Sequence, residues 1–353
     1  MKDQPHPGLG TLNRLFMAAE LLHLNKTDWS GLRLGLIEEL EAHLHPQAQM
    51  QVIESLQKQD SIQLILTTHS PNLASKLKLE NLIICKDRNA YPMGKHYTKL
   101  AEDNYKFLEK FLDTTKANLF FAKGVILVEG WAEEILIPSI AKNIGINLTE
   151  KGVSIVNIGH TGFDHYTSIY LRKLEPSMTT PVAVVTDVDI QTYEKILSVD
   201  IEGKPCKDAH GKNQYKFEKI QNTVVDQKTA SKISDLESKS EKNIKYFITP
   251  EWTLEYALYK STSLSPIFKQ ALKSIHTDTP WDVDFERELA KKLLTKGLEK
   301  PKIAYLVANA IDEDLAKFIK GEISEKTIQI LIDDNPDDSI AYLVKAIRYA
   351  SGN

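Results

Sequence analysis

Residues 125–130 read Val-Ile-Leu-Val-Glu-Gly, and this stretch decides the fold. It is a short, β-branched apolar run that stops at an acid and a glycine, which is typical of a buried parallel strand. Residues 181–186 form a second run of this kind, which ends in Asp187-Val188-Asp189. Because open α/β sheets build their sites at the carboxyl ends of parallel strands, we predict that Glu129, Asp187 and Asp189 meet there.

Carboxylates gathered at one strand edge repel each other unless cations neutralise them. Hard oxygen ligands suit Mg²⁺ or Mn²⁺. Glu133 lies one helical turn after Glu129 and can face the same edge, although an exposed helical acid is an equal alternative. The sequence therefore predicts a divalent-cation site.

The composition describes an ordinary globular chain. Its 353 residues are 42% hydrophobic and 26% charged, with a net charge of −4, so binding a polyanion would require a local basic face. Cys85 and Cys206 are far apart and form no metal-ligand spacing or disulfide framework. Neither a signal-peptide pattern nor an apolar run of about 18 residues occurs, so we expect a cytoplasmic protein without a membrane partner.

Two successive series of strands and helices are expected, followed by helices. The first has helices at 12–24 and 46–59 and strands at 32–37, 62–67 and 82–85; residues 86–118 form a connection with some helix. The second has strands at 125–128, 153–158, 182–186 and 244–248 and helices at 131–144, 163–174 and 251–259. Residues 200–243 are Lys- and Ser-rich and suggest an insertion with mobile parts, and the chain after Ser265 is helical with breaks near Asp278, Lys300 and Asn335.

The first series carries its own acids at a strand end. Glu38 and Glu39 follow the strand at 32–37, and His69 follows the strand at 62–67. Such an acid pair suits one group that binds Mg²⁺ and another that polarises a water for attack on a phosphate, while His69 could contact the γ-phosphate. A solvated strand end is the alternative for each of them.

These residues, in this order, resemble the C-terminal half of an ABC-type ATPase head. Residues 8–13 resemble its signature segment, Glu38-Glu39 its Walker B end, residues 41–46 its D-loop and His69 its switch histidine. No G-x-x-x-x-G-K-[ST] loop occurs anywhere in the sequence, so the backbone cradle for phosphates is missing. ATP is therefore expected as a ligand only if another chain or segment supplies that lobe.

The second series resembles a Toprim domain, which pairs a Glu after its first strand with Asp-x-Asp after a later one. The resemblance implies that Glu129, Asp187 and Asp189 hold the metals, with Glu133 and Glu255 as helpers. It also implies that Lys300 offsets charge on the scissile phosphate. A surface lysine is the alternative for Lys300, and Lys302 is its rival.

An ATPase head followed by Toprim is the arrangement of the OLD (overcoming lysogenization defect) family of ATP-dependent nucleases. The resemblance implies a Mg²⁺- or Mn²⁺-dependent DNA endonuclease with a two-metal site, acting in phage defence or DNA repair. It also implies a homo-oligomer in the full-length form and a partner that carries the P-loop lobe or resembles a helicase. The basic face that DNA needs is expected among the lysines of the insertion and of the C-terminal part, Lys204, Lys207, Lys212, Lys216, Lys219, Lys291, Lys292, Lys296, Lys300 and Lys302.

The predicted fold is α/β: a partial ABC-ATPase lobe at 1–90, a connection at 91–120, a Toprim domain of parallel sheet flanked by helices at 121–265 with an insertion near 200–243, and a helical region at 266–353. Three alternatives remain. A non-catalytic DNA-binding or regulatory remnant is disfavoured by the intact carboxylate set. A Toprim strand-transfer enzyme needs a tyrosine in a separate domain, and a chromosome-maintenance ABC protein needs long coiled-coil heptads; neither feature is recognisable.

Overall fold

The computed structural model describes residues 8–24, 31–59, 61–208 and 210–352. The chain forms two compact units. The N-terminal unit comprises residues 1–121 with 164–178, and the sheet unit comprises residues 122–163 with 179–353. The predicted boundaries at 90, 120 and 265 remain predictions, and each unit is described by itself.

The sheet unit is built on four parallel strands in the order β10-β7-β5-β6. These are β5 (Gly124–Val128), β6 (Val153–Asn157), β7 (Val182–Thr186) and β10 (Ile244–Ile248). Every residue of β5 and β7 is buried, which explains why both central strands are continuous apolar runs rather than alternating ones. The predicted parallel α/β sheet is confirmed.

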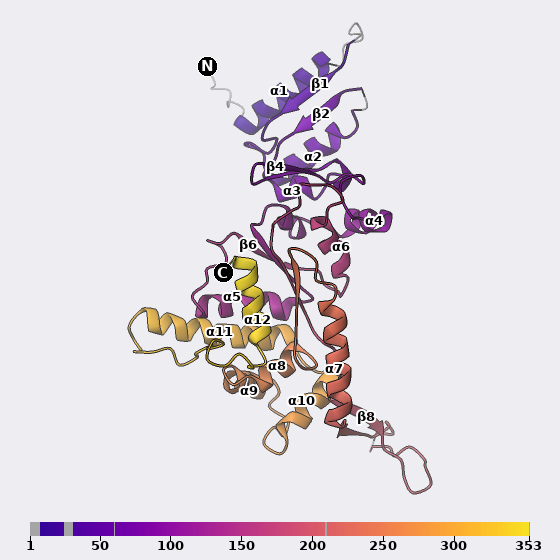
Figure 1. Ribbon diagram of the computed structural model, residues 1–353, viewed down its shortest axis with the longest axis vertical. Helices are drawn as coiled ribbons and strands as arrows, with labels where there is room; N and C mark the ends of the chain where they lie inside the picture. The colour runs from indigo at the N-terminus through magenta and orange to yellow at the C-terminus, as the bar shows by residue number, and fades with distance from the viewer. Residues whose placement is uncertain (1–7, 25–30, 60, 209, 353) are drawn as a thin grey trace, which may run out of the picture. The chain divides into compact units, whose positions relative to one another are not determined.

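Helices cover one face of this sheet. Ile126, Val128, Ala183 and Val185 alternate along β5 and β7 and join one apolar core with residues of α5 (Trp131–Asn143), α11 (Lys300–Ile319) and α12 (Ala341–Ser351). Helix α12 packs on β7, β5 and β10 and also touches α5, which in turn packs against α11 (Figure 1). The C-terminal helices thus complete the core of the sheet.

A glycine at the start of β5 sets the position of α12. A Cβ atom on Gly124 would lie 1.9 Å from the backbone oxygen of Ala350, which no side chain tolerates. The C-terminal end of α12 is therefore held against the N-terminal end of β5. Because α12 packs along β5 and β7, its first turn lies toward the carboxyl ends of those strands.

Helices and one ribbon make up the other regular elements of the sheet unit. Helix α8 (Leu254–Lys260) is followed by α9 (Ser265–Ile275) and α10 (Phe285–Leu294), which with α11 and α12 confirm the predicted helical C-terminal region. The helix predicted from Glu251 begins only at Leu254, because Trp252 has a φ of 38° and Thr253 is extended. Between β7 and β10 the chain forms an antiparallel ribbon of β8 (Tyr193–Leu197) and β9 (Tyr215–Lys219), then α7 (Asn222–Glu237).

The N-terminal unit contains a smaller layer of two parallel strands. Strands β1 (Leu34–Ile37) and β2 (Gln63–Leu66) pair in register, with α1 (Leu9–Leu24), α2 (Pro46–Leu56) and α3 (Pro71–Ala74) around them (Figure 1). Leu40, Ile53, Leu56 and Leu73 form its core. Leu34, Leu36 and Ile65, by contrast, are 39%, 71% and 52% exposed, so an apolar face of this small sheet is uncovered among the described residues.

The remainder of this unit departs from prediction in two places. The expected connection at 86–118 contains α4 (Glu102–Phe111) and also the strand β4 (Asn89–Pro92). This strand forms a hairpin with the preceding strand β3 (Ile83–Lys86). The helix predicted at 163–174 is wrong in length. It stops as α6 (Phe163–Thr167) and a 3-10 turn (Ser168–Tyr170), because Leu171 is extended and Arg172 bridges to Thr98. None of the described helices combines the length and apolar character that spanning a bilayer requires.

Candidate active site

The carboxyl ends of β5 and β7 bring the predicted acids together. Leu127 of β5 pairs with Val184 of β7 in parallel register, so Glu129 and Asp187 emerge at the same sheet edge. The Thr186 hydroxyl donates a short hydrogen bond to the Glu129 carboxylate, which ties the two strand ends directly. We call this the acidic edge and define it by Glu129, Glu133, Asp187, Asp189 and Glu255.

Two residues at this edge have strained backbones. Asp189 has a φ of 56° and Trp252 a φ of 38°, and the Asp189 amide donates to the Trp252 oxygen at 2.9 Å. The Val188 amide donates to the Thr249 hydroxyl at 2.8 Å. Non-glycine residues with positive φ persist only where the surroundings hold them, and they concentrate at functional sites. These bonds fix the turn that presents Asp187 and Asp189.

Helices beginning at this edge supply the remaining groups. Glu133 lies in the first turn of α5, Glu255 in the first turn of α8, and Lys300 is the first residue of α11. The Lys300 ammonium lies 2.9 Å from a Glu255 carboxylate oxygen, and that carboxylate is buried. The partial positive charge of a helix N-terminus also favours acids placed there. The edge therefore gathers five carboxylates and one ammonium from four stretches of chain.

The electrostatics of the acidic edge show how closely these groups interact. Burial, with the charge of Glu255 added to it, raises the pKa of Glu133 to about 7. Burial and the charges of Glu255 and Glu133 raise the pKa of Asp187 well above its usual value. Burial likewise raises the pKa of Glu129, although the Thr186 hydrogen bond opposes it. The acids thus resist being charged together, and a cation would relieve this.

Asp189 and Lys300 complete this picture. Burial raises the pKa of Asp189, while the charges of Lys300 and Lys232 act against that rise. Burial would lower the pKa of Lys300, but Glu255, Asp187 and Glu133 outweigh it, and the pKa is raised. Lys300 therefore stays charged at neutral pH, and it is the positive group closest to the buried Glu255.

The donor set of the acidic edge suits a hard divalent cation. Carboxylate oxygens are the ligands that Mg²⁺ and Mn²⁺ take, and their raised pKa values show that charge compensation is incomplete. Across the described ranges, no three His, Cys, Asp or Glu side chains stand in a ready-made metal-ligand group. Side-chain rotations that draw Glu129, Asp187 and Asp189 together would thus have to accompany binding.

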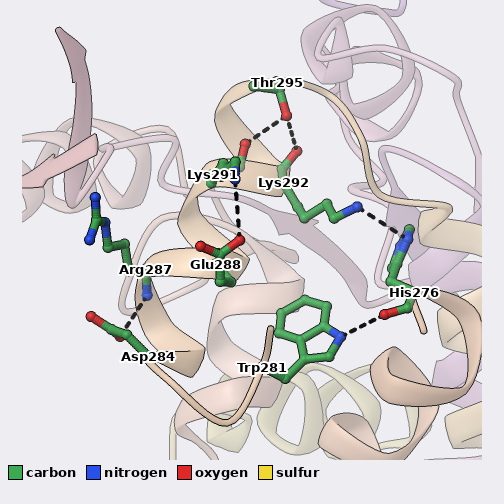
Figure 2. Close-up of polar contacts among 8 residues, drawn as sticks. All are labelled: His276, Trp281, Asp284, Arg287, Glu288, Lys291, Lys292 and Thr295. Atoms are coloured by element: carbon green, nitrogen blue, oxygen red, sulfur yellow. Dashed lines mark hydrogen bonds and ion pairs between the residues drawn. The ribbon is translucent and has the colours of Figure 1, made fainter. Parts of the chain in front are cut away.

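Five of the ten lysines expected to form a basic face pair with nearby acids. Lys204 pairs with Glu202, Lys219 with Glu286 and Lys302 with Glu299. On α10, Lys291 points to Glu288, while the Lys292 ammonium lies 3.5 Å from a ring nitrogen of His276 (Figure 2). Lys300, by contrast, pairs with a carboxylate of the acidic edge.

The N-terminal unit places its predicted residues at one edge too. Glu38 and Glu39 follow β1 and His69 follows β2, and all three side chains are exposed. Glu39 has a φ of 47°, and its amide donates to the Thr67 hydroxyl at 3.0 Å. An exposed, presented acid pair is the arrangement that contact with a ligand would require.

Glu41 is a structural residue that the sequence did not single out by itself. Its carboxylate accepts from the Thr68 hydroxyl at 2.7 Å and from the His69 amide at 2.5 Å. Burial would raise the pKa of Glu41, but these hydrogen bonds lower it. Glu41 thereby fixes the chain at Thr68 and His69. Only the tertiary contact between the two strand ends reveals this role.

Comparisons with known proteins agree with both halves of the chain. The family described as "Overcoming lysogenization defect protein-like, TOPRIM domain" matches residues 120–189, and an AAA ATPase domain family matches residues 6–74. Endonuclease GajA from Bacillus cereus is 23% identical over 376 residues, covering 89% of this chain and 54% of that protein. The OLD nuclease of Thermus scotoductus is 27% identical over 173 residues, covering 45% of this chain and 32% of that protein.

Solved structures are also similar. The C-terminal region of the Burkholderia pseudomallei OLD protein has 20% identity and a TM-score of 0.35, covering 66% of this chain and 98% of that one. The chain spans about half the length of GajA, and about a third of the Thermus protein. The ATPase-domain match and the Toprim match stand in the same order as the strand-end acids described above, and over these segments the chain is similar to proteins of the OLD family.

Proposed function

We propose that this chain is a Mg²⁺- or Mn²⁺-dependent DNA endonuclease that hydrolyses phosphodiester bonds at the acidic edge. The observation that carries the proposal is the convergence of Glu129, Glu133, Asp187 and Glu255 with Lys300 at the carboxyl ends of β5 and β7. The relatives named as nucleases support it.

The chemistry divides between cations and side chains. Bound divalent cations would polarise the scissile phosphate and lower the pKa of a bound water. Glu129, Asp187 and Asp189 would hold them, and Glu133 and Glu255 would assist. Thr186 contacts Glu129 and backbone bonds fix the turn at Asp189, so the backbone that carries these carboxylates is already in place and side-chain rotations complete the site when a cation binds. Lys300 would supply positive charge toward the phosphate.

Plasmid cleavage tests the proposal. Supercoiled DNA should be nicked or linearised in Mg²⁺ or Mn²⁺ and left intact in EDTA, since the carboxylates alone repel the polyanion. DNA affinity should fall steeply as salt rises, with little sequence preference, because phosphate contacts dominate. Cation-independent cutting would refute the proposed chemistry, whereas binding without any cutting would favour the non-catalytic alternative.

Lys300 and Lys302 offer a matched pair of variants. Lys300→Gln should lower cleavage roughly 10- to 100-fold, the range for groups that support a metal site. Lys302→Gln should cleave like the parent, because its ammonium reaches Glu299 on its own helix. Initial rates of plasmid nicking measure both.

A folding control separates charge from stability. Lys300→Gln leaves the buried Glu255 without its partner, which destabilises the chain by itself. Adding Glu255→Gln removes that unpaired charge and should restore the melting temperature but not the cleavage rate. Equal cleavage by Lys300→Gln and Lys302→Gln would remove Lys300 from the site.

The N-terminal unit is proposed as one half of an ATP-binding head, with the phosphate-binding lobe supplied from elsewhere. The uncovered apolar face at Leu34, Leu36 and Ile65 supports this, because such surface is usually covered by a partner. The chain alone should therefore hydrolyse no ATP, since Glu38, Glu39 and His69 lack a phosphate cradle. A phosphate-release assay checks this, and turnover that disappears in Glu39→Gln would contradict it.

A further inference from the structure

The first turn of α12 brings a tyrosine to the acidic edge. The C-terminal end of α12 is fixed against Gly124 at the opposite end of β5, and the helix packs along β5 and β7. Tyr342 is the second residue of the helix, so it lies toward the strand ends that carry Glu129 and Asp187. No part of the proposed chemistry uses this residue so far.

The hydroxyl of Tyr342 is buried without a hydrogen-bond partner among the described residues. The side chain is only 7% exposed, and its oxygen is inaccessible to solvent. Leaving a buried polar group unpaired is unfavourable, so an acceptor close to this hydroxyl is expected to accept a hydrogen bond from it. Such a group requires an explanation in terms of a bond that forms during function.

The charges around Tyr342 identify the acceptors. Burial raises the pKa of Tyr342 well above its usual value, and the next contributions come from Asp187, Glu133, Glu255 and Glu129, in that order. All four carboxylates belong to the acidic edge. A neutral phenol beside them can only donate, because its deprotonation is opposed both by burial and by their charge. Because Glu255 is already paired with Lys300, Asp187 is the foremost acceptor for the Tyr342 hydroxyl.

We propose that the Tyr342 hydroxyl is a positioning group of the acidic edge, which donates a hydrogen bond to the Asp187 carboxylate and orients it for cation binding. This inference rests on the proposed metal-dependent function. The bond would occupy one lone pair of Asp187, hold the carboxylate in one rotamer and leave its remaining oxygen lone pairs for the cation. Groups that orient metal ligands in this way typically change metal affinity or activity by about 10- to 100-fold.

Tyr342→Phe tests the inference, because it removes one oxygen atom and keeps the ring. Tyr349→Phe is the matched control: it lies on the same helix, two turns on, and its ring packs on Phe247 at 5.8 Å. Mn²⁺ binding is followed by electron paramagnetic resonance of the free ion, without DNA. The parent and Tyr349→Phe should bind alike, and Tyr342→Phe should bind roughly 10-fold more weakly.

Two further measurements separate positioning from packing. The Mn²⁺ concentration for half-maximal cleavage should rise in Tyr342→Phe, while the rate at saturating Mn²⁺ stays near that of the parent. The metal-free melting temperature should not fall, because the hydroxyl is unpaired before a cation binds and the substitution keeps the ring. If the melting temperature does fall, Tyr342→Phe is combined with Asp187→Asn. Tyr342→Phe should have little additional effect on Mn²⁺ binding in that double variant, and additive effects would overturn the inference.

The outcomes distinguish the two proposals. A parent protein that binds no Mn²⁺ would defeat the proposed function itself. A parent that binds Mn²⁺, with Asp187→Asn weakened and Tyr342→Phe unchanged, would leave the function intact and defeat the role of Tyr342.

Discussion

Asp187→Asn should reduce Mg²⁺- or Mn²⁺-dependent plasmid cleavage by at least about 100-fold, the upper range for groups that only support a metal site. Asp187 emerges from the central strand β7 and is surrounded by the charges of Glu255, Glu133 and Glu129. The amide keeps the shape of the side chain and removes its charge.

The same substitution should not destabilise the metal-free protein. Burial and the like charges of neighbouring carboxylates disfavour the charged form of Asp187. Replacing it with a neutral amide relieves this repulsion, so the melting temperature in EDTA should equal that of the parent or rise. Asp282→Asn is the control, because that side chain is 90% exposed and pairs with Lys273 at the surface. Undiminished cutting by Asp187→Asn would show that the acidic edge is not the active site.

The stability of the metal-free protein should fall as pH rises from about 4.5 to 7. Glu133 has an ordinary pKa of 4.5 and a pKa of about 7 in the folded chain, so the folded state binds its proton more tightly than the unfolded state does. A group whose pKa is raised on folding contributes its full stabilisation at pH values below its pKa in the unfolded state. This contribution is lost as the pH rises through its pKa in the folded state. A shift of this size corresponds to roughly 3 kcal/mol, and the raised pKa values of Asp187 and Glu129 act in the same direction.

Thermal unfolding in EDTA at a series of pH values measures this loss. Glu133→Gln should flatten the decline between pH 5 and 7.5, because the amide does not titrate in that range. Mg²⁺ at pH 8 should restore much of the lost melting temperature in the parent, since binding to the folded state alone stabilises it. A parent and Glu133→Gln that decline in parallel would show that Glu133 is not held in the environment described.

Local sequence patterns predicted the strands well and their assembly poorly. The runs that became β5 and β7 are buried and apolar, and the limits of these strands and of β10 could be read almost residue by residue. The order β10-β7-β5-β6 could not be read, because register and neighbours are set by packing between distant segments. Placing Glu129 beside Asp187 depended instead on the general rule for strand ends.

The groups brought in by helices were the hardest to foresee. Lys300 resembled any surface lysine until α11 placed it 2.9 Å from Glu255. Tyr342 gave no signal at all, since a tyrosine in an apolar helix normally indicates core. The ribbon of β8 and β9 was hidden by its polar composition, which predicts irregular chain although cross-strand pairing orders it. Only tertiary contacts distinguish these cases.

The placement of α12 also sets when the site can exist during synthesis. A chain leaves the ribosome from its N-terminus, and α12 follows every other described element of the sheet unit. Until residues 341–351 have emerged, Ile126, Val128, Ala183 and Val185 lack the helix that shares their core, and Asp187 lacks Tyr342. The core of the sheet and the acidic edge are thus complete only after translation of this unit has finished.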